Sequence, residues 1–92
     1  MPCYVVCFDI SDDRARDRVG KRLLHHGERV QESVFEIQIE STEGLQALRQ
    51  TLREEIDRDD KIHFYRLCLS CRKASMDGDE RPIAAFPAVM IV

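Results

Sequence analysis

Asp9 has the strongest chemical signal in the sequence, because it is an acid that directly follows the uncharged apolar run Tyr4–Phe8. Aromatic and β-branched residues in that run predict a strand buried on both faces. A carboxylate at the end of such a strand is held rigidly and reaches solvent, and carboxylate oxygens bind hard cations such as Mg²⁺. The simpler alternative is that Asp9 forms a turn by hydrogen-bonding its own backbone.

Basic residues follow Asp9, in residues 14–29. Six arginines and lysines there stand against two acids, which gives a local charge of +4, although the whole chain carries −3. Residues 40–60 are the counterpart, with seven acids against three arginines, a local charge of −4. A basic face can bind phosphate even when the total charge is negative. The alternative is a solvated helix face with no ligand.

The four cysteines divide into two pairs. Cys3 and Cys7 lie on one face of the expected first strand and are most simply small core residues. Cys68 and Cys71 form a CxxC pair, which supplies only half of the ligands of a structural zinc site. A zinc-binding or redox role for this second pair is left open as an alternative.

The location expected from the sequence is the cytoplasm, with no membrane contact. No apolar run approaches the roughly 20 residues that a membrane-spanning helix needs. The N-terminal residues lack the basic stretch of a signal peptide. A cytoplasmic protein is in turn not expected to hold structural disulfides.

Two helices are expected. Ala15, Val19 and Leu23 recur at helical spacing and predict the first, over Asp12 to His26, with Gly27 ending it in a left-handed conformation. A second helix should begin at Ser41 or Thr42, both good caps. Its apolar stripe is formed by four residues: Leu45, Leu48, Leu52 and Ile56.

Alternation of apolar and polar residues predicts the remaining strands. In residues 28–39 the apolar positions change face partway, so a bulge or bend is expected near Ser33 to Phe35. Lys61 to Leu69 reads as another strand. Residues 70–82 form a polar segment with a turn at Asp77–Asp79, and Ala88–Val92 form a short final strand.

The order of these elements predicts an α+β fold, the ferredoxin-like βαββαβ sandwich with an additional C-terminal strand. We expect one domain over residues 1–92, with a core at about 3–69 and a variable tail at 70–92. The helices cover one face of the sheet, whereas the first strand is apolar on both. An identical chain is the simplest cover for the second face, which predicts a two-fold homodimer able to bring two copies of Asp9 together.

Three motifs carry a resemblance to a known family. They are Asp9-Ile10-Ser11-Asp12-Asp13, then Arg16-x-Arg18, then Gly27-x-Arg29-Val30-Gln31-x-Ser33-Val34-Phe35-Glu36. In type and spacing they resemble the CRISPR-associated Cas-two family, small proteins that partner the CRISPR integrase (Cas-one) in spacer acquisition. The resemblance is strong over roughly the first 40 residues.

The resemblance implies a homodimeric, metal-dependent endonuclease that acts on RNA or double-stranded DNA with Mg²⁺, or with Mn²⁺ in its place. Asp9 would be the metal ligand. The implied catalytic residues are Asp9, Arg16, Arg18, Arg29, Ser33 and Phe35. An alternative function is a DNA-binding dimeric adaptor of the integrase in which Asp9 is catalytically idle. A third is a small ligand- or metal-binding module that uses Cys68 and Cys71.

Overall fold

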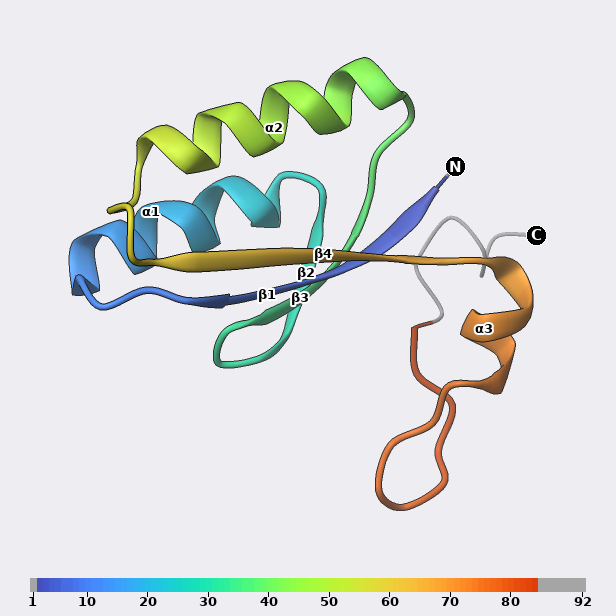
Figure 1. Cartoon of the computed structure of the whole chain (residues 1–92). Helices are drawn as coiled ribbons and strands as arrows, with labels where there is room; N and C mark the ends of the chain where they lie inside the picture. Colours follow the sequence, from blue (N-terminus) through green and yellow to red (C-terminus); the bar gives the residue numbers. More distant parts are fainter. Residues whose placement is uncertain (1, 85–92) are drawn as a thin grey trace.

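Two helices pack on one face of a four-stranded antiparallel sheet in the computed structural model, which describes residues 2–84 (Figure 1). The elements in chain order are β1 (Cys3–Asp9), α1 (Asp13–Leu24), β2 (Gly27–Gln31), β3 (Val34–Gln38), α2 (Thr42–Glu54), β4 (Lys61–Leu67) and α3 (Leu69–Ala74). The sheet order is β2-β3-β1-β4. This order is the ferredoxin-like α+β fold that the sequence predicted.

Strand β1 lies in the middle of the sheet, between β3 and β4. Tyr4, Val6 and Phe8 are buried beneath the helices, where they join one continuous core with residues of β3, α1 and α2. Side chains alternate along a strand, so Cys3, Val5, Cys7 and Asp9 lie on the opposite face. The prediction that Asp9 ends a central strand is confirmed.

Helix α1 begins as predicted but ends earlier. The Asp12 carboxylate caps it by accepting a hydrogen bond from the Ala15 backbone N–H at 2.8 Å. The predicted apolar stripe, Ala15, Val19 and Leu23, is buried. The helix stops at Leu24 rather than His26, and Leu24 itself is 50% exposed.

The expected left-handed role of Gly27 is wrong, because none of the glycines among the described residues has a positive φ. Gly27 is instead the first residue of β2. A Cβ atom at this position would lie 1.9 Å from the backbone oxygen of Glu36. The glycine is therefore required by the close approach of β2 to β3.

The predicted break within residues 28–39 is confirmed. A turn at Glu32 and Ser33 separates β2 from β3, and their register shifts between Arg29 and Gln31. The side chain of Val30 is exposed beside this irregularity. The change of apolar face in the sequence thus marks two short strands.

Helix α2 is capped by Ser41, whose hydroxyl oxygen accepts a hydrogen bond from the Gly44 N–H at 3.0 Å. Leu48 and Leu52 are buried on its inner face. Leu45 and Ile56 pack against the same core from its edge. The predicted second helix is confirmed with Leu45, Leu48 and Leu52 of its stripe, whereas Ile56 follows the end of the helix at Glu54.

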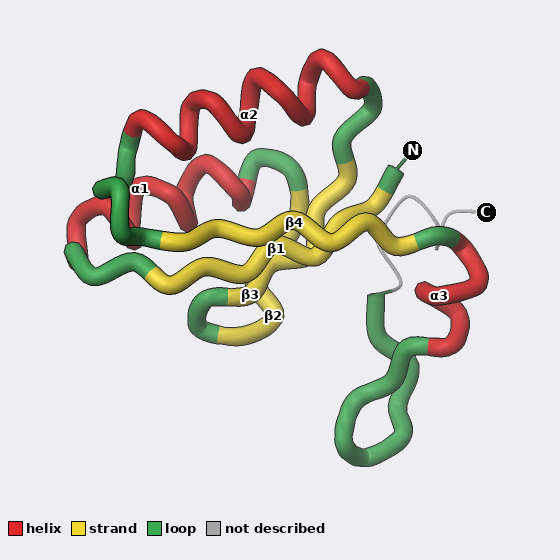
Figure 2. Tube along the Cα trace, viewed as in Figure 1, coloured by secondary structure: helices red, strands yellow, loops and turns green. Residues whose placement is uncertain are grey.

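The chain after β4 differs from the prediction. The strand ends at Leu67 rather than Leu69, and the short helix α3 follows, which was not predicted within the polar segment. The helix forms because Cys68 accepts a hydrogen bond from the Cys71 N–H and Ser75 donates one to the Cys71 carbonyl oxygen. Figure 2 shows α3 and the following loop leaving the sheet on the side away from α1 and α2.

The rest of the tail is partly as predicted. The turn at Asp77–Asp79 is present, with the Asp77 carboxylate accepting hydrogen bonds from the Asp79 and Arg81 N–H groups. Ala84 returns to the sheet and is buried against Cys3, beside Leu67. The final strand predicted at Ala88–Val92 lies outside the described residues. Between residues 2 and 84, the helices are all too short or too polar to cross a lipid bilayer.

Candidate active site at the end of strand β1

Asp9 is exposed at the end of β1, opposite Lys61 of β4. It lies on the sheet face that α1 and α2 do not cover. Within residues 2–84 no three His, Cys, Asp or Glu side chains gather into a possible metal site. Mg²⁺ often takes only one or two protein carboxylates, with water and substrate phosphate completing its six ligands. Asp9 therefore fits a Mg²⁺ site as one ligand of a set that a single chain leaves incomplete.

The loop that follows Asp9 is held by Asp60, the last residue of the acidic run at residues 40–60. One carboxylate oxygen of Asp60 accepts hydrogen bonds from the Ser11 N–H at 3.2 Å and the Ser11 hydroxyl at 3.3 Å. The other accepts one from the Asp57 N–H at 3.0 Å. These bonds, first from Asp57 and then from Ser11, lower the pKa of Asp60. Asp60 thereby ties the loop after β1 to the loop before β4.

Arg16 lies against the same loop. Its guanidinium donates a hydrogen bond to the Ile10 carbonyl oxygen at 3.0 Å and pairs with Asp13. Ile10 directly follows Asp9, so the structure brings this predicted site residue beside the candidate ligand. Arg16 stands seven residues after Asp9 because a short loop and the first turn of α1 lie between them.

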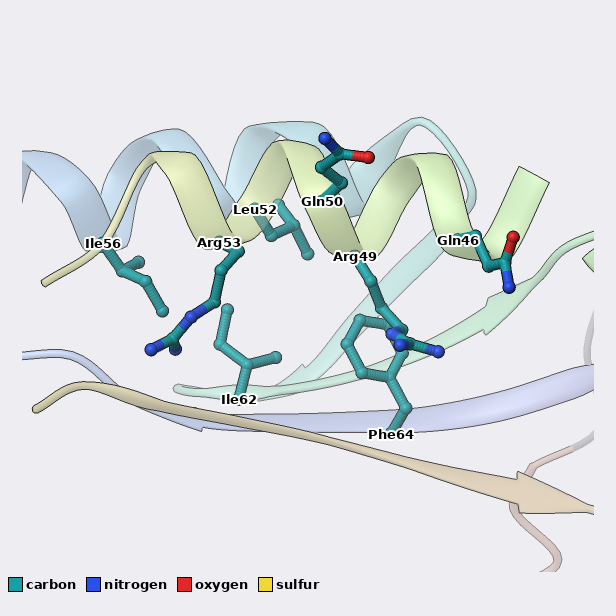
Figure 3. Close-up of a pocket in the computed structure, with 8 residues that line it drawn as sticks. All are labelled: Gln46, Arg49, Gln50, Leu52, Arg53, Ile56, Ile62 and Phe64. Atoms are coloured by element: carbon teal, nitrogen blue, oxygen red, sulfur yellow. The ribbon is translucent and has the colours of Figure 1, made fainter. Parts of the chain in front are cut away.

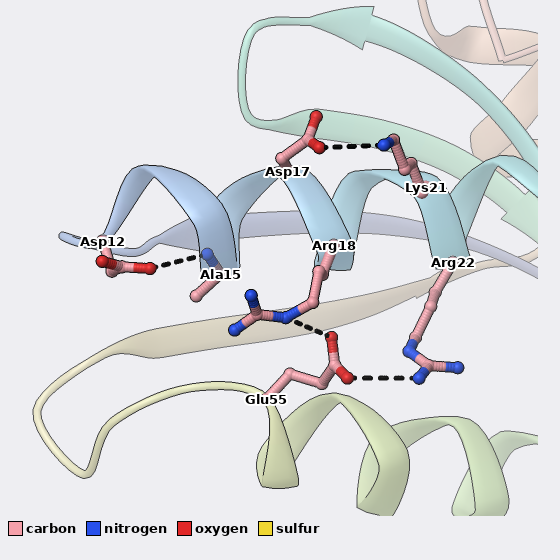
Figure 4. A network of polar contacts seen from close by, with 7 residues as sticks. All are labelled: Asp12, Ala15, Asp17, Arg18, Lys21, Arg22 and Glu55. Carbon is pink, nitrogen blue, oxygen red and sulfur yellow. Dashed lines mark hydrogen bonds and ion pairs between the residues drawn. The ribbon is translucent and has the colours of Figure 1, made fainter.

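Arg18 is directed to another partner. Its Nε atom lies 3.2 Å from one oxygen of Glu55, and Nη2 of Arg22 lies 3.1 Å from the other (Figure 4). The hydrogen bond from Arg22 is the largest reason that the pKa of Glu55 is lowered. In this arrangement Arg18 joins α1 to the end of α2, and the structure does not bring it to Asp9.

Arg29 and Phe35 form a unit on the side of the sheet that faces α1. They are cross-strand partners, and the Arg29 guanidinium carbon lies 5.2 Å from the centre of the Phe35 ring. Phe35 is fully buried and stacks on Phe8 with ring centres 5.8 Å apart. This packing connects Arg29 to Phe8, the residue before Asp9, whose side chain lies on the opposite face of the sheet from Asp9. Because Phe35 is buried, it can affect a substrate only through the residues that it positions.

Ser33 lies in the turn between β2 and β3 and is half-buried. Its carbonyl oxygen accepts a hydrogen bond from the Phe8 N–H at 3.1 Å. This bond fixes the turn to β1 one residue before Asp9. The structure therefore places Arg16 and Ser33 against the chain next to Asp9, whereas Arg29 and Phe35 lie on the helix-covered side of the sheet.

A separate recess of about 430 Å³ lies between α2 and β4 (Figure 3). Its lining combines arginines, glutamines and apolar side chains: Gln46, Arg49, Gln50, Leu52, Arg53, Ile56, Ile62 and Phe64. None of these is a predicted site residue, and the lining holds no carboxylate. We therefore locate the candidate chemistry at Asp9 and not in this recess.

Known proteins resemble this chain in both sequence and fold. The family model for CRISPR associated protein Cas2 matches residues 1–74. A protein named CRISPR-associated endoribonuclease Cas2 1, from Chloroflexus aurantiacus, is 42% identical over 96 residues, covering 97% of this chain and 98% of its own. A Synechocystis protein named CRISPR-associated endoribonuclease Cas2 3 is 33% identical, with 97% of each chain covered.

Solved structures that resemble this chain indicate the same family as these relatives. A chain of a partial Cas6-RT-Cas1–Cas2 complex matches with a TM-score of 0.84 and 32% identity, over 91% of this chain and 98% of that one. Streptococcus pyogenes Cas2, solved at pH 6.5, matches with a TM-score of 0.74 and 25% identity, over 82% of this chain and 96% of that one. The family match over most of the chain and the identity to full-length relatives lead to one conclusion: the chain belongs to the CRISPR-associated Cas2 family.

Proposed function

We propose that this chain is a Mg²⁺-dependent endonuclease that hydrolyses phosphodiester bonds in RNA, double-stranded DNA or both. It would act in the cytoplasm, in spacer acquisition, together with the CRISPR integrase Cas1. The observation that carries the proposal is the exposed carboxylate of Asp9 at the end of the central strand, on the uncovered face of the sheet. The names of the relatives as endoribonucleases support RNA as one substrate.

The functional unit would be a two-fold homodimer that packs on this uncovered face. Val5 and Cys7 of β1 are only half-buried there, and Tyr65 of β4 is 53% exposed. Within residues 2–84, Ala84 packs against Cys3 at one end of this face. Two copies that stack β1 on β1 would bury these apolar side chains and bring two Asp9 carboxylates near each other.

Asp9 of each copy would hold the metal ion, with Mn²⁺ able to replace Mg²⁺. Such an ion polarises a phosphodiester and lowers the pKa of bound water. Arg16 and Arg29 would place positive charge beside the substrate phosphates. Phe35 and Ser33 would position that end of the site, while Arg18 would contribute once released from Glu55.

The test is cleavage of labelled RNA and labelled double-stranded DNA by wild type and by Asp9→Asn. We expect wild type to cut in Mg²⁺ or Mn²⁺ and to stop in excess chelator, and Asp9→Asn to be inactive while it keeps its melting temperature and oligomeric state. Asp59→Asn is the matched control, because it removes one exposed carboxylate elsewhere. Undiminished cleavage by Asp9→Asn would rule out the proposal.

The second candidate is a DNA-binding adaptor in which Asp9 is catalytically idle. It is favoured by the engagement of Arg18 with Glu55 and by the match to a chain from a complex titled with Cas1 and Cas2. Spacer integration by Cas1 in the presence of Asp9→Asn separates the two roles. Full integration would make nuclease chemistry dispensable for adaptation, and lost integration would make it necessary.

A further inference from the structure

Cys68 and Cys71 lie on the surface where β4 passes into α3, away from the candidate active site. Both thiols are exposed, whereas Cys3 is buried and Cys7 is half-buried. The Cys71 backbone N–H donates a hydrogen bond to the Cys68 sulfur at 3.4 Å. The Ser70 hydroxyl and the Cys68 sulfur share another at 3.2 Å. The Cys68 sulfur is therefore held over the turn that carries Cys71.

The surroundings of the pair favour a thiolate. No acidic residue occurs in residues 61–76, while Arg66, Arg72 and Lys73 flank the two cysteines in the sequence. Hydrogen bonds, first from Ser70 and then from Cys71, lower the pKa of Cys68 to about 7. A hydrogen bond with the Cys68 side chain, and then the charge of that side chain, raises the pKa of Cys71. Cys68 is thus the more acidic thiol of the pair, and Cys71 keeps its proton to higher pH.

A zinc site is a poor fit to this pair. Structural zinc takes four protein ligands. In the part of the chain that the structure describes, no third His, Cys, Asp or Glu joins Cys68 and Cys71. Two exposed thiols at this spacing instead match the arrangement of dithiol redox pairs.

We propose that Cys68 and Cys71 form a reversible dithiol–disulfide pair that is oxidised by small-molecule disulfides, with Cys68 as the attacking thiol and Cys71 as the resolving thiol. The Cys68 thiolate attacks one sulfur of the small disulfide and releases a small thiolate, leaving a mixed disulfide on Cys68. Cys71 loses its proton to solvent and attacks the Cys68 sulfur, releasing the second small thiolate. The pair gives up two electrons, and the small disulfide becomes two thiols.

The position of the pair gives the oxidation a structural consequence. Residue 68 follows β4, and α3 begins the tail that returns to the uncovered sheet face. Arg72 of α3 donates a hydrogen bond to the Ala84 carbonyl oxygen at 3.4 Å, and Ala84 is buried against Cys3. A disulfide between Cys68 and Cys71 would therefore fix the conformation of the turn from which the tail extends.

The first test exposes the purified full-length protein to mixtures of oxidised and reduced glutathione, blocks free thiols with an alkylating agent and digests with trypsin. Cleavage after Arg66 and Arg72 keeps both cysteines on one peptide, residues 67–72. We expect this peptide to carry two alkyl groups after reducing mixtures. After oxidising mixtures it should carry none and weigh two hydrogen atoms less than the unalkylated dithiol peptide. Two separate glutathione adducts, or two thiols that stay free, would overturn the proposal.

The second test assigns the roles of the two thiols. Cys71→Ser should accumulate a stable glutathione adduct on Cys68, whereas Cys68→Ser should react much more slowly at Cys71. In wild type, the alkylation rate of Cys68 should rise with pH with a midpoint near the pKa of about 7. Faster reaction of Cys71 than of Cys68 would reverse the roles, and stoichiometric zinc bound through Cys68 would overturn the redox pair. Cys7→Ser, far along β1, is the control and should leave the pair unchanged.

Discussion

The Arg29 guanidinium lies over the Phe35 ring, with 5.2 Å between its central carbon and the ring centre, and Gly20 of α1 makes room for both. A Cβ atom on Gly20 would approach the Arg29 Nη2 atom to 3.0 Å and the Phe35 ring to 3.4 Å. The exposed guanidinium thus packs on the buried Phe35 ring. Because Gly20 has no side chain, α1 can lie close to both residues. Arg29 is a fixed charge rather than a free one.

Phe35→Leu tests this support. Leucine keeps an apolar side chain in the core but removes the ring face, so we expect the free energy of unfolding to fall by about 1–3 kcal/mol. Cleavage should fall further than the loss of folded protein explains, because Arg29 loses its fixed position. Urea unfolding and cleavage rates are measured at a temperature where both proteins are folded. Phe64→Leu, in β4, is the control, and equal activity in the two variants would contradict the support role.

Asp60 predicts an acid-dependent stability. Its pKa in the folded protein lies below the ordinary value of 3.8, so its contribution to stability is complete above that value and is lost as the pH falls through the lowered pKa. We expect Asp60→Asn to unfold at lower urea concentration than wild type at pH 7, and the difference to shrink in acid. Urea midpoints across this range are compared with those of Asp59→Asn. A difference that is independent of pH would contradict the role of the ionised carboxylate.

Glu55 restrains two arginines of α1, Arg18 and Arg22. Glu55→Gln should release both, so we expect tighter binding of double-stranded DNA and a steeper loss of affinity with salt. Glu54→Gln removes the same charge from the neighbouring residue and is the matched control. Anisotropy titrations of labelled DNA at several salt concentrations give both quantities. Identical effects of the two variants would show that only net charge matters.

Gly27 is predicted to be the least replaceable glycine. Alanine there would place its Cβ 1.9 Å from the Glu36 backbone oxygen, so Gly27→Ala should cost at least about 1–3 kcal/mol of folding free energy. Gly78 has open space around it, and Gly78→Ala should leave stability within about 1 kcal/mol of wild type. Thermal unfolding of the two variants checks this. Similar melting temperatures would contradict the close approach of β2 to β3.

Local patterns in the sequence were enough to predict the core stripes of α1 and α2 and the place of Asp9 at a strand end. Local patterns failed to predict the role of a residue where that role depends on a tertiary contact. Gly27 looked like the end of a helix. A glycine is needed there because the backbone of Glu36, on the next strand, leaves no space for a side chain. Glu55 and Asp60 looked like members of an acidic run, and their roles come from partners 37 and 49 residues away in the chain.

The most direct test of the paired Asp9 site is to mix wild type and Asp9→Asn in varied proportions under conditions of subunit exchange and to measure cleavage per total protein. If the metal site needs a carboxylate from each copy, only dimers with two wild-type subunits are active. We then expect the rate to follow the square of the wild-type fraction. A rate that is directly proportional to the wild-type fraction would mean that each subunit works alone and would contradict the shared site.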